Sequence, residues 1–237
     1  MMKRIIVYLY LLTAIPAFSQ LRLVPDATGN KVFVWLERAP RQDEQYHVYR
    51  KTGNGVFLQL TESPIASVTS GAELVAKMGL AFEGFRKQLD ETDPQAVFLR
   101  LQADRFRAKL YGYALPELGL ALGQLFVDEK APNGETATYK VEWVNGQGEP
   151  RGQAMTGTVH IHPEIPPAPE NLSATHEGPR ITLKWDFPQS TDDMADQVVR
   201  FEVQRQAENG KFVAIQDAWL MRDANQTRHA FIYSETG

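Results

Sequence analysis

The sequence predicts a mostly β protein built from two β-sandwich modules, the first with an α-helical insert and the second apparently incomplete. Two observations support this fold class. Alternating apolar and polar residues, which indicate half-buried strands, recur along most of the chain. Between residues 60 and 125 the apolar residues instead repeat with the helical period of about 3.6. The chain has 237 residues, enough for two domains that each bury a core.

The first 20 residues have the pattern of a secretory signal peptide. Two basic residues precede an apolar run over residues 5–12, and a small-residue cleavage site follows at Ala17 to Ser19. The run is shorter than the roughly 20 residues that cross a bilayer as a helix, so we expect no stable membrane span after cleavage. The absence of cysteine excludes disulfides and thiolate metal sites. We therefore expect an exported protein that is periplasmic, cell-surface or secreted.

An internal repeat sets the expected organisation. Trp35 is followed by an alternating strand pattern at residues 46–50, a glycine turn and a strand that begins with phenylalanine. Trp185 is followed by the same series, with its alternating strand at residues 201–205. Each module is thus expected to open with a half-buried strand that carries an indole. The structural signature of the repeat consists of Trp35, Tyr46, Val48, Arg50, Tyr139, Val141, Trp185, Phe201, Val203 and Arg205.

These residues resemble those of fibronectin type III modules, as do the proline-rich entry at residues 166–172 and a tyrosine-corner pattern at 138–141. The signal peptide is similar to those of exported Bacteroidota proteins. The resemblance implies a first module at residues 21–163 and a second at residues 164–237. A second module of this length would lack its final strands. We expect either a fragment of a longer protein or completion by a partner strand.

The helical insert is expected at about residues 66–124, in place of an ordinary sandwich connection. A first helix is predicted at about residues 72–89, with one apolar stripe. A second is predicted at about residues 94–111, because Asp93 suits an N-cap and Pro94 a first helical position. The second helix carries apolar residues in two sectors, Leu99, Ala103, Phe106 and Leu110 in the first, and Val97, Leu101, Ala108 and Tyr111 in the second.

The two sectors of the second helix allow two interpretations. Ordinary packing would bury both, one on the first helix and the other on the sandwich or on residues 116–122. The functional interpretation leaves the second sector partly open as a docking surface. Four basic residues also make this helix locally basic, although a solvated, salt-bridged face is the more ordinary explanation. The possible partner-binding residues are Val97, Arg100, Leu101, Arg107, Ala108 and Tyr111.

Two patterns are candidates for metal sites. His160 and His162 lie two apart on an expected strand and so point the same way, with Glu164 as the nearest candidate for a third ligand. The acidic residues of the 192–196 segment lack the spacing of a calcium loop. The sequence has no serine elbow, zincin motif, phosphate loop or dinucleotide fingerprint. We expect no catalytic activity, no metal and no cofactor.

Charge and architecture together predict a non-catalytic binding or scaffolding role. A net charge of -4 without a general basic patch argues against nucleic-acid binding. The expected partner is another envelope or extracellular protein, or a polysaccharide. Recognition through the insert is favoured because long insertions in rigid folds often carry function. The alternative is that the modules are accessory spacers of a secreted hydrolase whose catalytic domain lies beyond residue 237.

Overall fold

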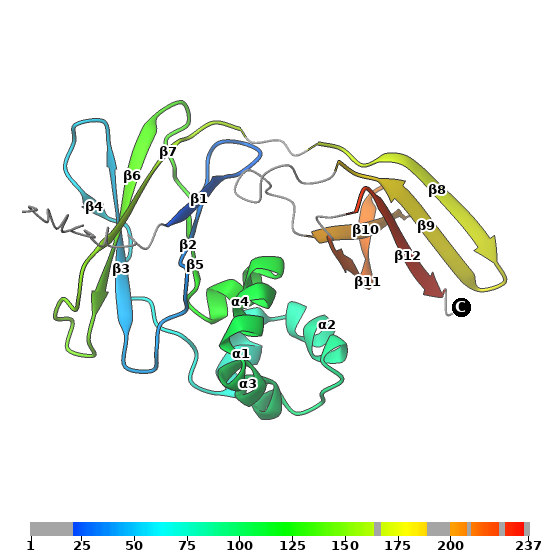
Figure 1. Ribbon diagram of the computed structural model, residues 1–237, viewed down its shortest axis with the longest axis horizontal. Helices are drawn as coiled ribbons and strands as arrows, with labels where there is room; N and C mark the ends of the chain where they lie inside the picture. The colour runs from blue at the N-terminus through cyan, green and yellow to red at the C-terminus, as the bar shows by residue number, and fades with distance from the viewer. Residues whose placement is uncertain (1–20, 164–166, 189–199, 208–209, 223–225, 235–237) are drawn as a thin grey trace, which may run out of the picture.

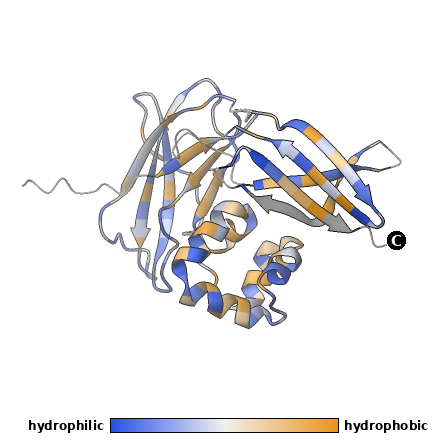
Figure 2. Cartoon of the chain, turned by 45° about the vertical axis from the view of Figure 1, so that its right-hand side comes forward, coloured by the Kyte–Doolittle hydropathy of each residue, from blue (hydrophilic) through white to orange (hydrophobic). Residues whose placement is uncertain are grey.

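The computed structural model describes residues 21–163, 167–188, 200–207, 210–222 and 226–234, and the statements below concern these residues. The predicted signal peptide, Glu164 and the acidic segment at 192–196 lie outside them. The described chain is mostly β, with several antiparallel sheets and a group of helices (Figure 1). The alternation predicted for the strands is visible as hydrophobic and hydrophilic bands along them (Figure 2).

Two antiparallel sheets form the first part of the chain. The first sheet has the order β1-β2-β5, with β1 at Arg22–Pro25, β2 at Val32–Trp35 and β5 at Leu125–Asp128. The second has the order β4-β3-β6-β7, with β4 at Leu58–Gln59, β3 at Gln45–Thr52, β6 at Thr136–Val144 and β7 at Met155–His160. Strands β3 and β6 pair along the whole of β3, which makes this the longest shared register of the two sheets.

The two sheets bury one hydrophobic core between them. On β2 and the residue that follows it, Val32, Val34 and Leu36 are completely buried because alternate residues of a strand share a face. The signature residues Tyr46, Val48, Tyr139 and Val141 lie in the same core. This arrangement is compatible with a β-sandwich, in which the inner faces of two sheets interdigitate. The core consists of Leu21, Val32, Val34, Leu36, Tyr46, Val48, Ala131, Ala137, Tyr139, Val141, Trp143 and Ile161.

A buried ionic group joins three strands of these sheets. Asp128 at the end of β5 lies 2.5 Å from Nη1 of Arg50 on β3, and the same carboxylate oxygen accepts a 2.7 Å hydrogen bond from the Tyr139 hydroxyl on β6. Nη1 of Arg50 also donates to the carbonyl oxygen of Lys130 at 2.7 Å. Burial, and then the Asp128 carboxylate, raises the pKa of Tyr139. The phenol therefore stays protonated. It bonds to a carboxylate, whereas the hydroxyl of a tyrosine corner bonds to the backbone, so the predicted tyrosine corner is not formed.

Helices occupy the region between β4 and β5 where the sequence predicts them, but each predicted helix is divided. The first is interrupted at Gly79, where φ is 56°. The second starts at the Asp93 cap and Pro94 as predicted, and breaks at Asp104, whose carboxylate caps the next helix. None of the described helices is long and apolar enough to cross a membrane. The helices are α1 at Gly71–Met78, α2 at Ala81–Gln88, α3 at Pro94–Ala103, α4 at Arg105–Ala114 and α5 at Pro116–Ala121.

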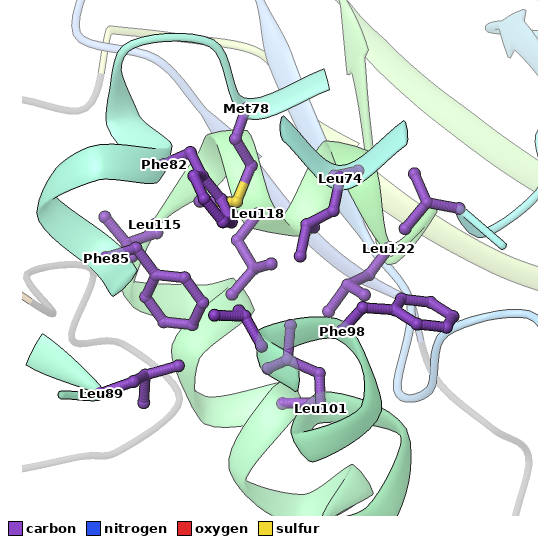
Figure 3. Close-up of a cluster of buried hydrophobic side chains, with 14 residues drawn as sticks. Leu74, Met78, Phe82, Phe85, Leu89, Phe98, Leu101, Leu115, Leu118 and Leu122 are labelled. Atoms are coloured by element: carbon purple, nitrogen blue, oxygen red, sulfur yellow. The ribbon is translucent and has the colours of Figure 1, made fainter. Parts of the chain in front are cut away.

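The helical segment, residues 71–121, has a hydrophobic core of its own (Figure 3). Helix α1 packs on α3 and α5, and α5 packs on α4 and on the start of β5. Helix α1 approaches α3 closely, since a Cβ atom at Gly71 would lie 2.4 Å from the Pro94 backbone. The core consists of Val68, Leu74, Met78, Phe82, Phe85, Leu89, Val97, Phe98, Leu101, Ala108, Leu115, Leu118, Ala121 and Leu122.

Trp35 connects the helical segment to the first sheet. Its neighbours Val34 and Leu36 are part of the sandwich core, so its indole lies on the opposite face of β2. The indole packs on Tyr113 of α4, with 4.9 Å between ring centroids. Gly119 of α5 lies so close that a Cβ atom there would be 2.8 Å from the indole ring. Trp35 is only 7% exposed as a result.

The second part of the chain repeats the strand pairing of the first. The order β12-β9-β8 corresponds to β5-β2-β1, and the pair β10-β11 corresponds to β3-β4. The aromatic-x-Val pattern is matched too, because Val203 on β10 is buried as Val48 is on β3. Arg205 differs from Arg50 in being exposed. The strands are β8 at Glu170–Glu177, β9 at Arg180–Asp186, β10 at Arg200–Gln206, β11 at Phe212–Met221 and β12 at Arg228–Ser234.

The prediction that Trp35 and Trp185 are matched is wrong. Trp185 is buried against Phe201 of β10, with ring centroids 5.2 Å apart, and it stacks on His229 of β12. It therefore packs between the two groups of strands, whereas Trp35 packs on helices. The reason is the face of the strand on which each indole lies, since alternate residues of a strand share a face. Trp35 lies between the core residues Val34 and Leu36 and so faces away from the core. Trp185 and Phe187 are themselves the buried residues at the end of their strand.

Replacement of Tyr139 by phenylalanine should lower the free energy of unfolding by about 1.5–3 kcal/mol near pH 7, because a hydrogen bond to a charged group is lost. The difference should narrow above pH 10. The raised pKa means that wild-type Tyr139 stays protonated when folded but ionises when unfolded, so its contribution to stability falls as the pH rises. Urea unfolding of both proteins between pH 7 and 11 measures this. A pH-independent difference would contradict the assignment.

Replacement of Gly119 by alanine should destabilise the protein by about 1–3 kcal/mol, because the added methyl group overlaps the buried indole of Trp35. Gly146 provides the control, since it lies in an exposed turn and a Cβ atom added there would have no other atom within 4 Å. Gly146→Ala should leave the urea midpoint almost unchanged. Equal effects of the two substitutions would show that the contact between Trp35 and α5 is not tight.

Candidate functional site

The most exposed apolar side chains of α3 and α4 belong to the first sector of the predicted second helix. Leu99 on α3 is 56% exposed, and Phe106 and Leu110 on α4 are 70% and 44% exposed. Phe106 and Leu110 are four residues apart, so they lie side by side on one face of α4. Single exposed leucines are common on protein surfaces, whereas Phe106 and Leu110 are two large exposed apolar residues that adjoin on one helix face.

The expectation that the second sector forms the docking surface is wrong for three of its residues. Val97, Leu101 and Ala108 are at most 5% exposed and lie in the core of the helical segment. Figure 3 labels Leu101 among the side chains of this core. Helices α1 and α5 cover that side of α3 and α4. The two sectors were derived from the periodicity of one continuous helix. When a helix has two apolar sectors, its sequence does not show which of them the neighbouring helices cover.

Three of the predicted partner-binding residues do lie at the surface, around a hollow between α2, α3 and α4. Arg100 and Arg107 are exposed and Tyr111 is half-buried. The hollow has a volume of about 220 Å³. This is less than the roughly 300–1,000 Å³ of sites that hold small organic ligands. It is lined by Leu89, Arg100, Leu101, Ala103, Asp104, Arg107 and Tyr111.

The charged side chains of this surface are largely basic. Residues 94–114 contain four basic residues and one acidic residue, a local net charge of +3 in a chain of net charge -4. Arg100 donates to the carbonyl oxygen of Leu89 at 2.9 Å, and Arg107 lies 3.2 Å from Asp104. Arg105 bonds the Gln102 side chain. Lys109 lies above an aromatic ring of the same helix, so its charge, like that of Arg105, faces no carboxylate among the described residues.

We call the α3–α4 surface the set formed by the hollow, the apolar residues Leu99, Phe106 and Leu110, and the basic residues Arg105 and Lys109. Its apolar part was missed by sequence reasoning, which assigned that sector to ordinary packing. Asp104 was the available signal. Aspartate is a preferred N-cap residue, so its presence in mid-helix indicates a helix restart and a change of the exposed face.

The histidine pair at the candidate metal site forms a different arrangement. The rings of His160 and His162 stack, with centroids 5.6 Å apart. His160 lies 3.3 Å from the Thr136 hydroxyl, and Nδ1 of His162 lies 3.0 Å from the carbonyl oxygen of His160. No group of three or more potential metal ligands occurs within the described ranges. The histidines therefore have polar neighbours of an ordinary kind.

Comparison with known proteins gives similarities to solved structures alone. No family model and no curated protein matches the sequence. The crystal structure of the chicken CNTN1 FN1-FN3 domains is similar to 90% of this chain at 10% sequence identity, with a TM-score of 0.28. This chain covers 55% of that chain, so it spans about half its length. The assignment of a β-sandwich therefore rests on the strand order and the buried core given above.

Two leucines on α3 provide a matched pair that tests the assignment of the buried and exposed sectors. Leu101→Ala should lower the free energy of unfolding by about 2–5 kcal/mol, because it leaves a cavity in the helical core. Leu99→Ala should change it by about 0.5 kcal/mol or less, because the side chain is exposed. Urea unfolding of the two variants measures both values. A larger loss for Leu99→Ala would reverse the assignment.

Proposed function

We propose that this chain is a non-catalytic binding or scaffolding component of an exported bacterial envelope or extracellular protein. In this proposal it contains two fibronectin type III-like modules at residues 21–163 and 164–237, the first with a helical insert at 66–124. The repeated strand pairing supports the modules. The leader pattern at residues 1–20 and the lack of cysteine support export, with a periplasmic, cell-surface or secreted location.

The recognition element in this proposal is the α3–α4 surface. The observation that supports it best is that the helical segment is fixed to the first sheet by Trp35 and yet leaves Leu99, Phe106 and Leu110 exposed. A rigid sheet that carries a helical insertion presents such residues in a fixed geometry, which lowers the entropy lost on binding. Residues 94–114 are thus both well anchored and apolar on the outside.

Substitutions test this proposal better than deletion of the helical segment, because deletion would uncover Trp35. The triple variant Leu99→Ser, Phe106→Ser, Leu110→Ser alters only exposed side chains and should fold normally. Affinity capture from the exported fraction of the source cells, quantified by mass spectrometry, should recover the partner with the wild type. Recovery with the triple variant should fall at least about tenfold, because truncation of apolar anchors costs more than about 1.4 kcal/mol.

The matched control is a triple serine variant of exposed apolar residues outside the surface. Leu80, Val56 and Leu58 are 97%, 78% and 59% exposed, and none belongs to α3 or α4. This control should capture the partner as well as the wild type does. If both triple variants fail to capture the partner, the interaction is nonspecific hydrophobic adsorption. If neither fails, recognition lies elsewhere on the molecule.

A further inference from the structure

We propose that the partner of the α3–α4 surface is an acidic protein segment that inserts one large apolar side chain into the hollow beside Arg100 and Arg107. This inference rests on the proposed function, since it gives the chemistry of the partner for the same surface. Three properties of the surface support it: the size of the hollow, the order of the side chains around α4, and the local charge.

The size of the hollow suits a single side chain. Its volume of about 220 Å³ is below that of a typical small-molecule site. Its walls include the apolar side chains of Leu89, Leu101 and Tyr111. Protein interfaces commonly place one buried apolar anchor in such a pocket, and that anchor then supplies much of the binding energy.

The side chains of α4 form three adjacent stripes around its surface. Each residue advances about 100° around a helix, so residues four apart stay nearly aligned. Arg107 and Tyr111 form the stripe beside the hollow. Phe106 and Leu110 form the next stripe, which is apolar, and Arg105 and Lys109 form the one after it, which is basic. A partner lying across α4 therefore meets a pocket, an apolar ridge and a basic edge in that order.

The local charge indicates an acidic partner. The net charge of residues 94–114 is +3, and neither Arg105 nor Lys109 forms an ion pair with another described residue. The guanidinium groups of Arg100 and Arg107 are exposed at the hollow as well. Complementary charge at the rim of an interface selects partners and speeds their association, so a partner that carries aspartate or glutamate as well as the apolar anchor fits this surface best.

A lipid bilayer fits the surface less well than a protein segment does. Anionic lipids would satisfy the basic edge, and the acyl region would bury Phe106 and Leu110. A bilayer surface has no side chain that enters the hollow, however, so this feature would remain without a role. The partner is therefore assigned as a protein, and membrane binding becomes an outcome of the experiment.

Selection from a random peptide library tests the partner chemistry even though the natural partner is unidentified. Phage-displayed 15-residue peptides are panned on the full chain, with counter-selection on the triple variant Leu99→Ser, Phe106→Ser, Leu110→Ser. Enriched peptides should contain an excess of aspartate and glutamate together with a large apolar residue. Enrichment of basic or uncharged peptides would overturn the inference, and so would the absence of any enrichment.

Two variants then test the hollow and the basic edge separately, with an enriched peptide as the probe. Ala103→Leu fills the hollow from its exposed wall and should weaken binding at least about tenfold, as loss of an anchor does. Arg105→Glu with Lys109→Glu should weaken it on the order of tenfold in low salt and less in high salt. Lys77→Glu on α1 is the control and should bind normally. Binding that is unaffected by both variants would contradict the inference.

Vesicles complete the test. Sedimentation with phosphatidylglycerol and phosphatidylcholine vesicles should leave the protein in solution, and cosedimentation lost in the Arg105→Glu, Lys109→Glu variant would instead assign a membrane partner. The two proposals fail differently. If capture of the natural partner needs Leu99, Phe106 and Leu110 but is indifferent to Ala103→Leu and to charge reversal, the proposed function stands and this inference is wrong.

Discussion

The packing of Trp35 on the helical segment is the contact on which the rest of the first part of the chain depends. Strand β2 has apolar residues on both faces, with Val34 in the sandwich core and Trp35 on the outside. Such a strand is stable only when both faces are covered. The helices supply the outer cover through Tyr113 and Gly119. They therefore act as a third layer that covers the outer face of the first sheet.

The Asp128 carboxylate fixes the point at which the chain returns from the helices to the sheets. It lies at the end of β5 and is held by Arg50 and Tyr139 from the two central strands of the second sheet. A buried ion pair contributes little net stability, because the desolvation of both charges opposes their attraction. Its geometric effect is larger. Strand β5 is attached to both sheets, so the helices that precede it end at a fixed position.

Strand parity and capping residues explain what the sequence could predict. The burial of Val48 and Val203 follows from alternation, and the start of α3 follows from Asp93 and Pro94. The face that a helix buries does not follow from its own periodicity when it has two apolar sectors. The buried face is set by α1, which packs on α3, and by α5, which packs on α4. Both lie outside the helix whose periodicity is read. The repeated tryptophan was misleading for a similar reason. A tryptophan at the same place in two repeats does not show which face of the strand its side chain lies on.

The inward face of α4 explains why its large apolar residues lie on its outer face. The buried positions of this helix are small, with Ala108 in the helical core and Gly112 so close to the chain after α5 that a Cβ atom would lie 2.6 Å from Oε1 of Gln124. Close packing thus uses the small residues, and the opposite face holds Phe106 and Leu110. A phenylalanine that is 70% exposed contributes little to the free energy of folding, and an exposed apolar surface lowers the solubility of the protein. The contact with a partner proposed above would bury this side chain.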